Sequence, residues 1–164
     1  MYLIALQNPG EKYKNTRHNA GAIICGEINN IDTDIKVLYS DVFMNLSGEY
    51  VRKIVKQNNI NTEKLFVVFD DINIPVGKFI ISKGEGASSH NGIKSIKNIL
   101  MKDDFWRVRI GVGEVSDDKN EKVRKVDGPD MSDFVLSALS DLEIAVIKSL
   151  AMSVVEKISL KLAK

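Results

Sequence analysis

Short apolar runs alternate along this chain with stretches of helical periodicity, and this alternation constrains the fold more than any single motif. The clearest run is "EKLFVVFDD" at residues 63–71, which predicts a buried strand that ends at Asp70 and Asp71. Further strands or extended segments are predicted at residues 1–7, 35–39, 75–82 and 104–113. Helices are predicted at residues 18–30, 44–59, 91–101 and over most of the C-terminal part, where Ser140 and Glu143 have the spacing of a capping box.

Strands that alternate with helices are typical of α/β proteins, in which helices cover both faces of a sheet. A chain of 164 residues is long enough for one domain with a substantial core. We therefore predict a single α/β domain over residues 1–164, built on a twisted, mostly parallel mixed sheet.

Composition excludes several classes of protein. The 23 basic and 22 acidic residues give a formal net charge of +1, so overall charge does not indicate a nucleic-acid-binding protein, and any basic surface must come from local clustering. The single cysteine, Cys25, excludes an internal disulfide and a cysteine-based zinc site. No apolar stretch has the length of a membrane span or of a signal-peptide core, so we expect a cytoplasmic protein.

Polar residues follow several of the predicted strands. Asn8 comes after the first strand, Asn45 after the second, and Asp70 at the end of the central one. In α/β sheets, ligands bind outside the carboxyl ends of the strands. These side chains are therefore expected to share one edge of the sheet, although each asparagine alone is more often a turn or cap residue.

The two histidines, His18 and His90, are the candidates for proton transfer near neutral pH. His18 lies near the start of a predicted helix, whose N-terminal dipole disfavours the protonated ring and keeps it available as a base. Asp70 could hold such a ring in the required tautomer. The alternative is structural: Asp70 caps a turn and His18 sits at a helix start. No carboxylate is assigned to His90.

Cofactor and metal sites find little support in the sequence. "GEGASS" and "GVGEVS" each match only part of a dinucleotide fingerprint, and the second enters a charged loop instead of a helix. Asp70 and Asp71 are adjacent on a strand, so their side chains point to opposite faces and cannot readily share an ion. We predict neither a metal nor an organic cofactor.

Five motifs in this chain resemble those of the bacterial-type peptidyl-tRNA hydrolase family. They are "ALQNPGEKYKNTRHNAG", "VFMNLSG", "FVVFDDINIPVG", "SSHNGIKSI" and "WRVRIGVG", and they occur in the family's order up to residue 113. The resemblance implies an α/β enzyme that hydrolyses the ester between a peptide and the terminal ribose of tRNA, with peptidyl-tRNA as its partner and as a monomer without cofactor.

The same resemblance implies roles for individual residues. His18 would activate water, Asp70 would orient His18, and Asn8 would hold the peptide end of the substrate. Tyr13, Phe43, Asn45 and Asn91 match positions that line the cleft for the tRNA 3′ end and the peptide. Arg109, perhaps with Arg107, matches a basic position that faces phosphate, and Lys94 and Lys97 are further candidates for phosphate contacts.

The chain also departs from the family's pattern. The segment between His18 and Met44 is shorter than usual, "SSHNG" stands where relatives have "GGHNG", and Ile80 and Ser82 occupy positions that are usually basic. These changes motivate an alternative, a catalytically weakened tRNA- or ribosome-associated RNA-binding protein of the same fold. A third, remoter alternative is a hydrolase of another small ester or amide.

Overall fold

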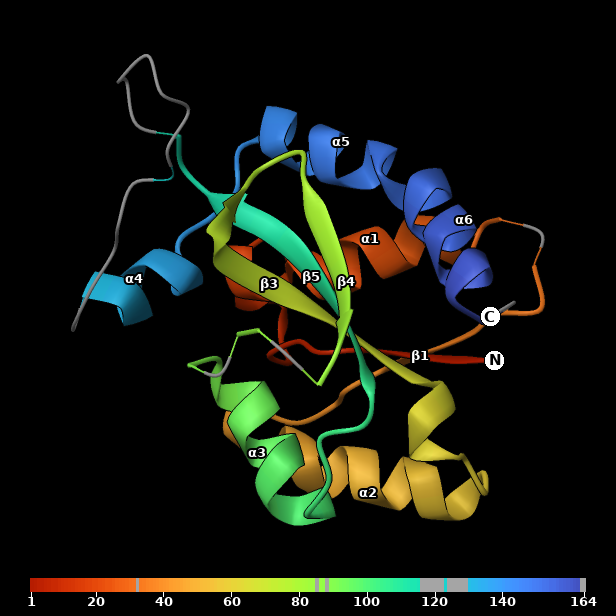
Figure 1. Ribbon diagram of the computed structural model, residues 1–164. Coiled ribbons are helices and arrows are strands. Elements are labelled where there is room, and N and C mark those ends of the chain that lie inside the picture. Colours follow the sequence, from red (N-terminus) through yellow and green to blue (C-terminus); the bar gives the residue numbers. More distant parts are fainter. Residues whose placement is uncertain (32, 85, 88, 116–122, 124–129, 163–164) are drawn as a thin grey trace.

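The computed structural model contains a sheet flanked by helices (Figure 1). It describes residues 1–31, 33–84, 86–87, 89–115, 123 and 130–162. Within these residues, no helix is both long and apolar enough to cross a membrane. The polar stretch predicted at residues 114–130 lies largely outside the described residues.

The described strands form one sheet in the order β2-β1-β3-β5-β4. Four strands are parallel, and β4 runs antiparallel to β5 at one edge. Their bounds are Tyr2–Ala5 for β1, Lys36–Tyr39 for β2, Leu65–Pro75 for β3, Phe79–Lys83 for β4 and Trp106–Gly113 for β5. This mixed, mostly parallel sheet confirms the predicted fold class.

Helices pack on both faces of the sheet, as the sequence predicts (Figure 1). One face carries α1 (Ala20–Ile28), α5 (Asp141–Ser149) and α6 (Ala151–Leu162), and the other carries α2 (Ser47–Gln57) and α3 (Asn91–Leu100). A short helix, α4 (Asp130–Leu136), lies apart from both layers. Short 3-10 turns occur at Glu11–Tyr13, Arg17–Asn19, Met44–Leu46 and Thr62–Lys64.

The central strand β3 explains why both faces are covered. Phe66 and Val68 pack in the cluster with α1, α5 and α6, whereas Val67 and Phe69 pack in the cluster with α2 and α3. Successive strand residues point to opposite faces, so a continuous apolar run must be buried on both. Burial of each such side chain contributes roughly 1.5–3 kcal/mol to the free energy of folding, so this strand contributes a large share of the core's stability.

Strand β3 is longer than predicted, and this changes the place of Asp70. The prediction ended the strand at Asp70 and Asp71, but it continues to Pro75 because β5 pairs with it as far as Gly113, across an irregularity in the register. The pairing with β1, in contrast, stops at Ala5 and Val68. Asp70 therefore lies inside a strand, just past the point where the neighbouring strand β1 has ended.

The C-terminal part is helical as predicted, but it is divided. Ser140 and Glu143 form the expected capping box at the start of α5. The helical structure is interrupted at Leu150, between α5 and α6. The final residue of the predicted apolar pattern, Leu162, is exposed.

Candidate functional site

A cavity of about 750 Å³ opens beside the carboxyl end of β1 and the middle of β3. Its walls come from the loop after β1, the turn before α2, the middle of β3, the start of α3, and α4. All of the predicted site residues except Arg109 line it: His18, Asp70, Asn8, Asn45, Asn91, Tyr13 and Phe43. Residues that were predicted from scattered motifs are thus brought together at one edge of the sheet.

His18 and Asp70 form the predicted pair. His18 sits in the turn Arg17–Asn19, which leads directly into α1, and its Nδ1 lies 2.8 Å from Asp70 Oδ1. Both side chains are almost completely buried, at 9% and 1% exposure. The other ring nitrogen, Nε2, has no hydrogen bond to the described residues, so it is the atom that can accept a proton from a ligand in the cavity.

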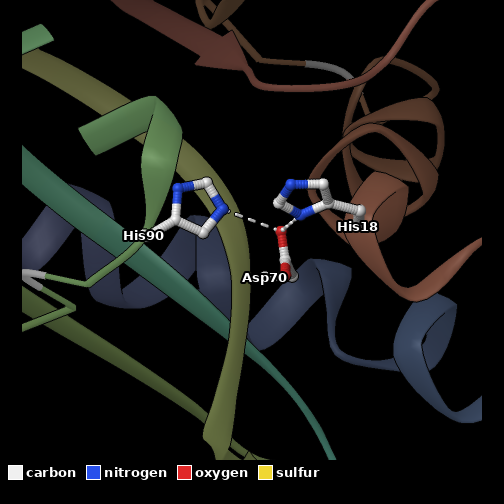
Figure 2. A group of neighbouring side chains, drawn as sticks. All are labelled: His18, Asp70 and His90. Atoms are coloured by element: carbon white, nitrogen blue, oxygen red, sulfur yellow. Dashed lines mark hydrogen bonds and ion pairs between the residues drawn. The ribbon is translucent and has the colours of Figure 1, made fainter. Parts of the chain in front are cut away.

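His90 also binds Asp70, which corrects the expectation that no carboxylate orients its ring. His90 Nε2 lies 3.0 Å from the same Oδ1 atom that His18 contacts. Figure 2 shows the two rings converging on this oxygen from opposite sides, one from the start of α3 and one from the segment before α1. The two ring centroids are 5.1 Å apart. We call His18, Asp70 and His90 the His–Asp–His triplet, or the triplet for short.

The charges of the triplet are strongly coupled. Burial lowers the pKa of His18, but the negative charge of Asp70 and its hydrogen bond outweigh this effect, so the pKa is raised above its ordinary value of 6.5. Burial raises the pKa of Asp70, but the two rings hold it below its ordinary range. Asp70 is therefore ionised throughout the neutral range.

The tautomer of His90 follows from its place at the start of α3. As the N-cap residue, it accepts a hydrogen bond from the backbone N–H of Ile93 on Nδ1, at 3.4 Å. A nitrogen that accepts carries no proton, so in the neutral ring the proton is on Nε2 and is donated to Asp70. The geometry thus supplies two N–H donors to one carboxylate oxygen.

In the described part of the chain, the triplet is also the one cluster of at least three His, Cys, Asp or Glu residues that could hold a metal ion. Its candidate ligand atoms lie within 4.8 Å of one another. A metal needs an unprotonated nitrogen from each histidine. His90 Nδ1 already accepts from Ile93, and its Nε2 carries the proton given to Asp70. In this state the donor set suits a hydrogen-bonded cluster better than a metal.

Asn8 is held rigidly beside the triplet. Its backbone N–H donates to Asn19 Oδ1 at 2.8 Å, and Asn19 Nδ2 donates back to the carbonyl of Asn8 at 3.0 Å. Its side-chain Oδ1 accepts from the N–H of Met44 at 3.0 Å, which fixes the orientation of the amide. Asn8 Nδ2, with no partner in the described residues, is therefore a preset donor in the cavity wall.

The rim of the cavity is aromatic and polar. Tyr13 and Phe43 meet edge to face with centroids 6.1 Å apart, and Phe43 is 49% exposed. Asn91 opens α3 and is exposed, as are Asn45 and Lys94. Exposed amides and rings at a cavity mouth can contact a nucleobase or ribose by hydrogen bonding and stacking.

Arg109 is not itself a lining residue, but it binds Asp71, which is. It belongs to a region that we call the basic corner: Arg107, Arg109 and Lys97 with Asp71 and Asp103. Arg109 Nε donates to Asp71 Oδ2 at 2.7 Å, and its side chain is 16% exposed. The expected phosphate contact of Arg109 remains a prediction.

Arg107 does not have the accessibility that a phosphate contact requires. It is 1% exposed, donates to the carbonyl of Gly86 at 2.8 Å and pairs with Asp103. Lys97 binds the same carboxylate at 2.7 Å. The expectation that Arg107 faces phosphate is thus wrong for this conformation, because a neighbouring turn supplies its counter-charge.

Arg17 is a residue that the sequence reasoning missed. Its buried guanidinium donates to the Val112 carbonyl at 3.0 Å and to Glu143 Oε1 at 2.8 Å, and it packs over the ring of Phe134 in α4. It therefore fastens the turn that carries His18 to β5, α4 and α5. The available signal was a charged residue directly beside His18 in "NTRHN".

The apolar part of the cavity lining was also missed. Met131, Val135 and Leu136 of α4 line the cavity together with Ser132. The helix is short and follows a polar stretch, so its periodicity alone gave no indication that it would lie over the site. These side chains create an apolar subsite beside a polar one.

Comparisons with known proteins agree with one another. Residues 25–164 match the family described as Peptidyl-tRNA hydrolase. The chain is 36% identical to a peptidyl-tRNA hydrolase of Fervidobacterium nodosum, covering 90% of this chain and 81% of the relative. It is 34% identical to one of Sulfurihydrogenibium sp., covering 86% and 79%. The crystal structure of peptidyl-tRNA hydrolase from Acinetobacter baumannii has the same fold, with a TM-score of 0.75 at 23% identity over 97% of this chain and 86% of that one.

Proposed function

This chain belongs to the peptidyl-tRNA hydrolase family, and we propose that it hydrolyses the ester bond of peptidyl-tRNA with a water molecule activated by His18. The observation that carries this proposal is the buried contact of 2.8 Å between His18 Nδ1 and Asp70 Oδ1, which leaves Nε2 available in a large cavity. The products are a free peptide and a free tRNA.

His18 acts as a general base and then as a general acid. With Nδ1–H donated to Asp70, Nε2 takes a proton from water while the oxygen adds to the ester carbonyl. The tetrahedral intermediate then collapses, the bond to the ribose oxygen breaks, and the protonated Nε2 returns its proton to that oxygen. Asp70 stabilises the imidazolium formed between these steps.

Asn8 is the candidate donor to the carbonyl oxygen. Negative charge develops on this oxygen as the tetrahedral intermediate forms, and fixed donors aimed at it lower the barrier. The amide of Asn8 is oriented before substrate binds, because Met44 N–H occupies its oxygen. Little reorganisation is then needed during the reaction.

The remaining predicted residues bind the two ends of the substrate. Asn91, Asn45, Tyr13 and Phe43 surround the mouth of the cavity, where the terminal ribose and base of tRNA would lie. Lys94 in the same wall is placed to approach a phosphate. The apolar side chains of α4 would contact the peptide. Arg109 would reach phosphate after leaving Asp71.

We further propose that residues 1–164 form one hydrolase domain that acts as a cytoplasmic monomer without a metal. The proposal is supported by the closed set of contacts that the triplet and Asn8 make with residues of the same cavity. Sedimentation of the protein with and without a chelator, beside the activity assay, tests this proposal.

The direct experiment incubates the protein at catalytic concentration with N-acetylated aminoacyl-tRNA and follows deacylation, with unblocked aminoacyl-tRNA as the control. We expect many turnovers on the blocked substrate and few on the control. Tight binding without turnover would instead support the alternative, a weakened RNA-binding protein. Neither binding nor turnover, with cleavage of simple esters, would support the third alternative.

A further inference from the structure

His90 is buried against the same carboxylate as His18, but both of its ring nitrogens already have partners, Asp70 and the backbone N–H of Ile93, so it does not duplicate the base. Its side chain is 8% exposed, and its ring packs on Phe69 with centroids 4.8 Å apart. Gly92 leaves room for it, since a Cβ there would stand 3.1 Å from His90 Cε1 and 2.7 Å from Leu6 Cδ1. The ring is therefore held in one position from three sides.

This position fixes the direction of one proton. Nδ1 accepts from the N–H of Ile93, so Nε2–H points at Asp70 Oδ1. The positive end of the N–H dipole then lies beside the oxygen that His18 uses. A second donor draws electron density from a carboxylate and weakens its attraction for a neighbouring cation.

We propose that His90 is a positioning residue for the reaction, which fixes Asp70 Oδ1 and limits the negative charge that this oxygen presents to His18. The inference rests on the proposed role of His18 as the base. Without His90, Asp70 would stabilise the protonated form of His18 more strongly, and less of the enzyme would hold the free base near neutral pH. The "HNG" motif thus links the start of α3, which carries Asn91, to the protonation equilibrium of His18.

Other charged groups near His18 leave this argument intact. Asp71 lines the same cavity but is paired with Arg109 at 2.7 Å, and Arg17 is paired with Glu143 and Glu114. Tyr13 and Lys94 line the same cavity, whereas the lining residues contributed by α4 carry no ionisable group. Glu27 of α1 pairs with Lys148 at 2.9 Å.

Two substitutions separate the proposed role from simple capping of α3. Serine is a good N-cap residue but is too short to reach Asp70, so His90→Ser keeps the cap and removes the second donor. Glutamine caps poorly but carries an amide donor at about the distance of Nε2, so His90→Gln keeps the donor. Thermal melts of both variants report the capping contribution.

The pKa of His18 can be followed without any substrate. The chain has only two histidines, so proton NMR shows two imidazole Cε1–H signals, which variants at each position assign. We expect the midpoint of His18 in His90→Ser to move upward by about 0.5 pH unit or more, with the midpoint in His90→Gln near that of wild type. An unchanged or lowered midpoint in a folded His90→Ser would overturn the proposal.

Deacylation measured across the same pH range separates this proposal from the proposed function. If the NMR midpoint moves and the acid limb of the rate moves with it, both proposals are supported. If the midpoint moves but wild type does not deacylate peptidyl-tRNA, the coupling of the two histidines stands and the assigned reaction fails. A rate limb that stays in place while the midpoint moves would contradict the role of His90 in the reaction.

Discussion

The His–Asp–His triplet and the basic corner are neighbouring charged clusters, but they differ in how their charges are paired. In the triplet, one buried carboxylate accepts from two rings and leaves His18 Nε2 facing the cavity. In the basic corner, each cation is already matched by a carboxylate of the chain itself, Arg107 and Lys97 by Asp103, and Arg109 by Asp71. The first region leaves a ring nitrogen available to a ligand, whereas the second has its cations paired within the chain.

The difference teaches that a charged residue in a family motif indicates a location rather than a free charge. Arg107 and Arg109 alternate on β5 with Val108 and Ile110, which pack in the core beneath α1, so strand geometry alone places both on the α3 side. Their partners come from a turn and from a neighbouring strand. The following variants test the comparison, from the largest expected effect to the smallest.

Asp70→Asn should have the largest effect, because it acts on the atom shared by both histidines. The amide can donate to His18 Nδ1, which would move the ring proton to Nε2 and remove the base. We expect single-turnover deacylation to slow by about 10²–10⁴-fold. Retained binding of peptidyl-tRNA is the control, and a rate within a few-fold of wild type would mean that Asp70 does not orient the base.

Asn91→Ala should affect binding rather than chemistry. Its exposed amide at the start of α3 is assigned to the tRNA end, and its loss leaves a substrate group unpaired. We expect affinity to weaken by roughly 1–3 kcal/mol. A matched control is Asn98→Ala near the other end of α3. Equal affinities for these two variants would reduce Asn91 to a helix-start residue.

Arg107→Met should destabilise the protein without weakening its contacts with phosphate. The variant leaves the Gly86 carbonyl without its donor and removes one of two cations from Asp103. We expect a loss of about 1–3 kcal/mol in the free energy of unfolding, measured in urea.

Lys94→Gln should have the converse effect. Its free energy of unfolding should be unchanged, while the salt dependence of tRNA binding becomes shallower by about 0.7–0.9 in the log–log slope. If Arg107→Met changed the salt slope and Lys94→Gln changed the stability, Arg107 would be the phosphate contact and Lys94 the structural residue.

Asp71→Asn should open the basic corner. Its Oδ1 can still accept from Asn73, but the amide repels the Nε–H of Arg109 and releases the guanidinium. For wild type we expect a shallow salt slope, equivalent to only a few phosphates, and for the variant a slope steeper by about 0.7–0.9. A wild-type slope equivalent to eight or more phosphates would show that the basic corner already binds tRNA.

Much of this site was accessible from sequence because periodicity places strand ends, and strand ends meet at one edge. Asn8, Asn45 and Asp70 were placed at this edge by that rule, whereas His18 was identified as a histidine at a predicted helix start. The contact of His90 with Asp70 was not predicted, because it depends on the path of the loop before α3, which carries no periodic signal. The pairing of Arg109 with Asp71 depends on the register between β3 and β5, and the position of α4 depends on packing over a site already formed.

The most direct test of the central claim compares His18→Ala with His90→Ala in single-turnover deacylation at saturating enzyme, after binding has been confirmed for both. The account predicts that His18→Ala binds peptidyl-tRNA normally but reacts about 10²–10⁴-fold more slowly, the range for one positioned acid–base group. His90→Ala should retain most of its rate at alkaline pH, where His18 is neutral. A His18→Ala variant that reacts like wild type beside an inactive His90→Ala variant would contradict the account and assign the base to His90.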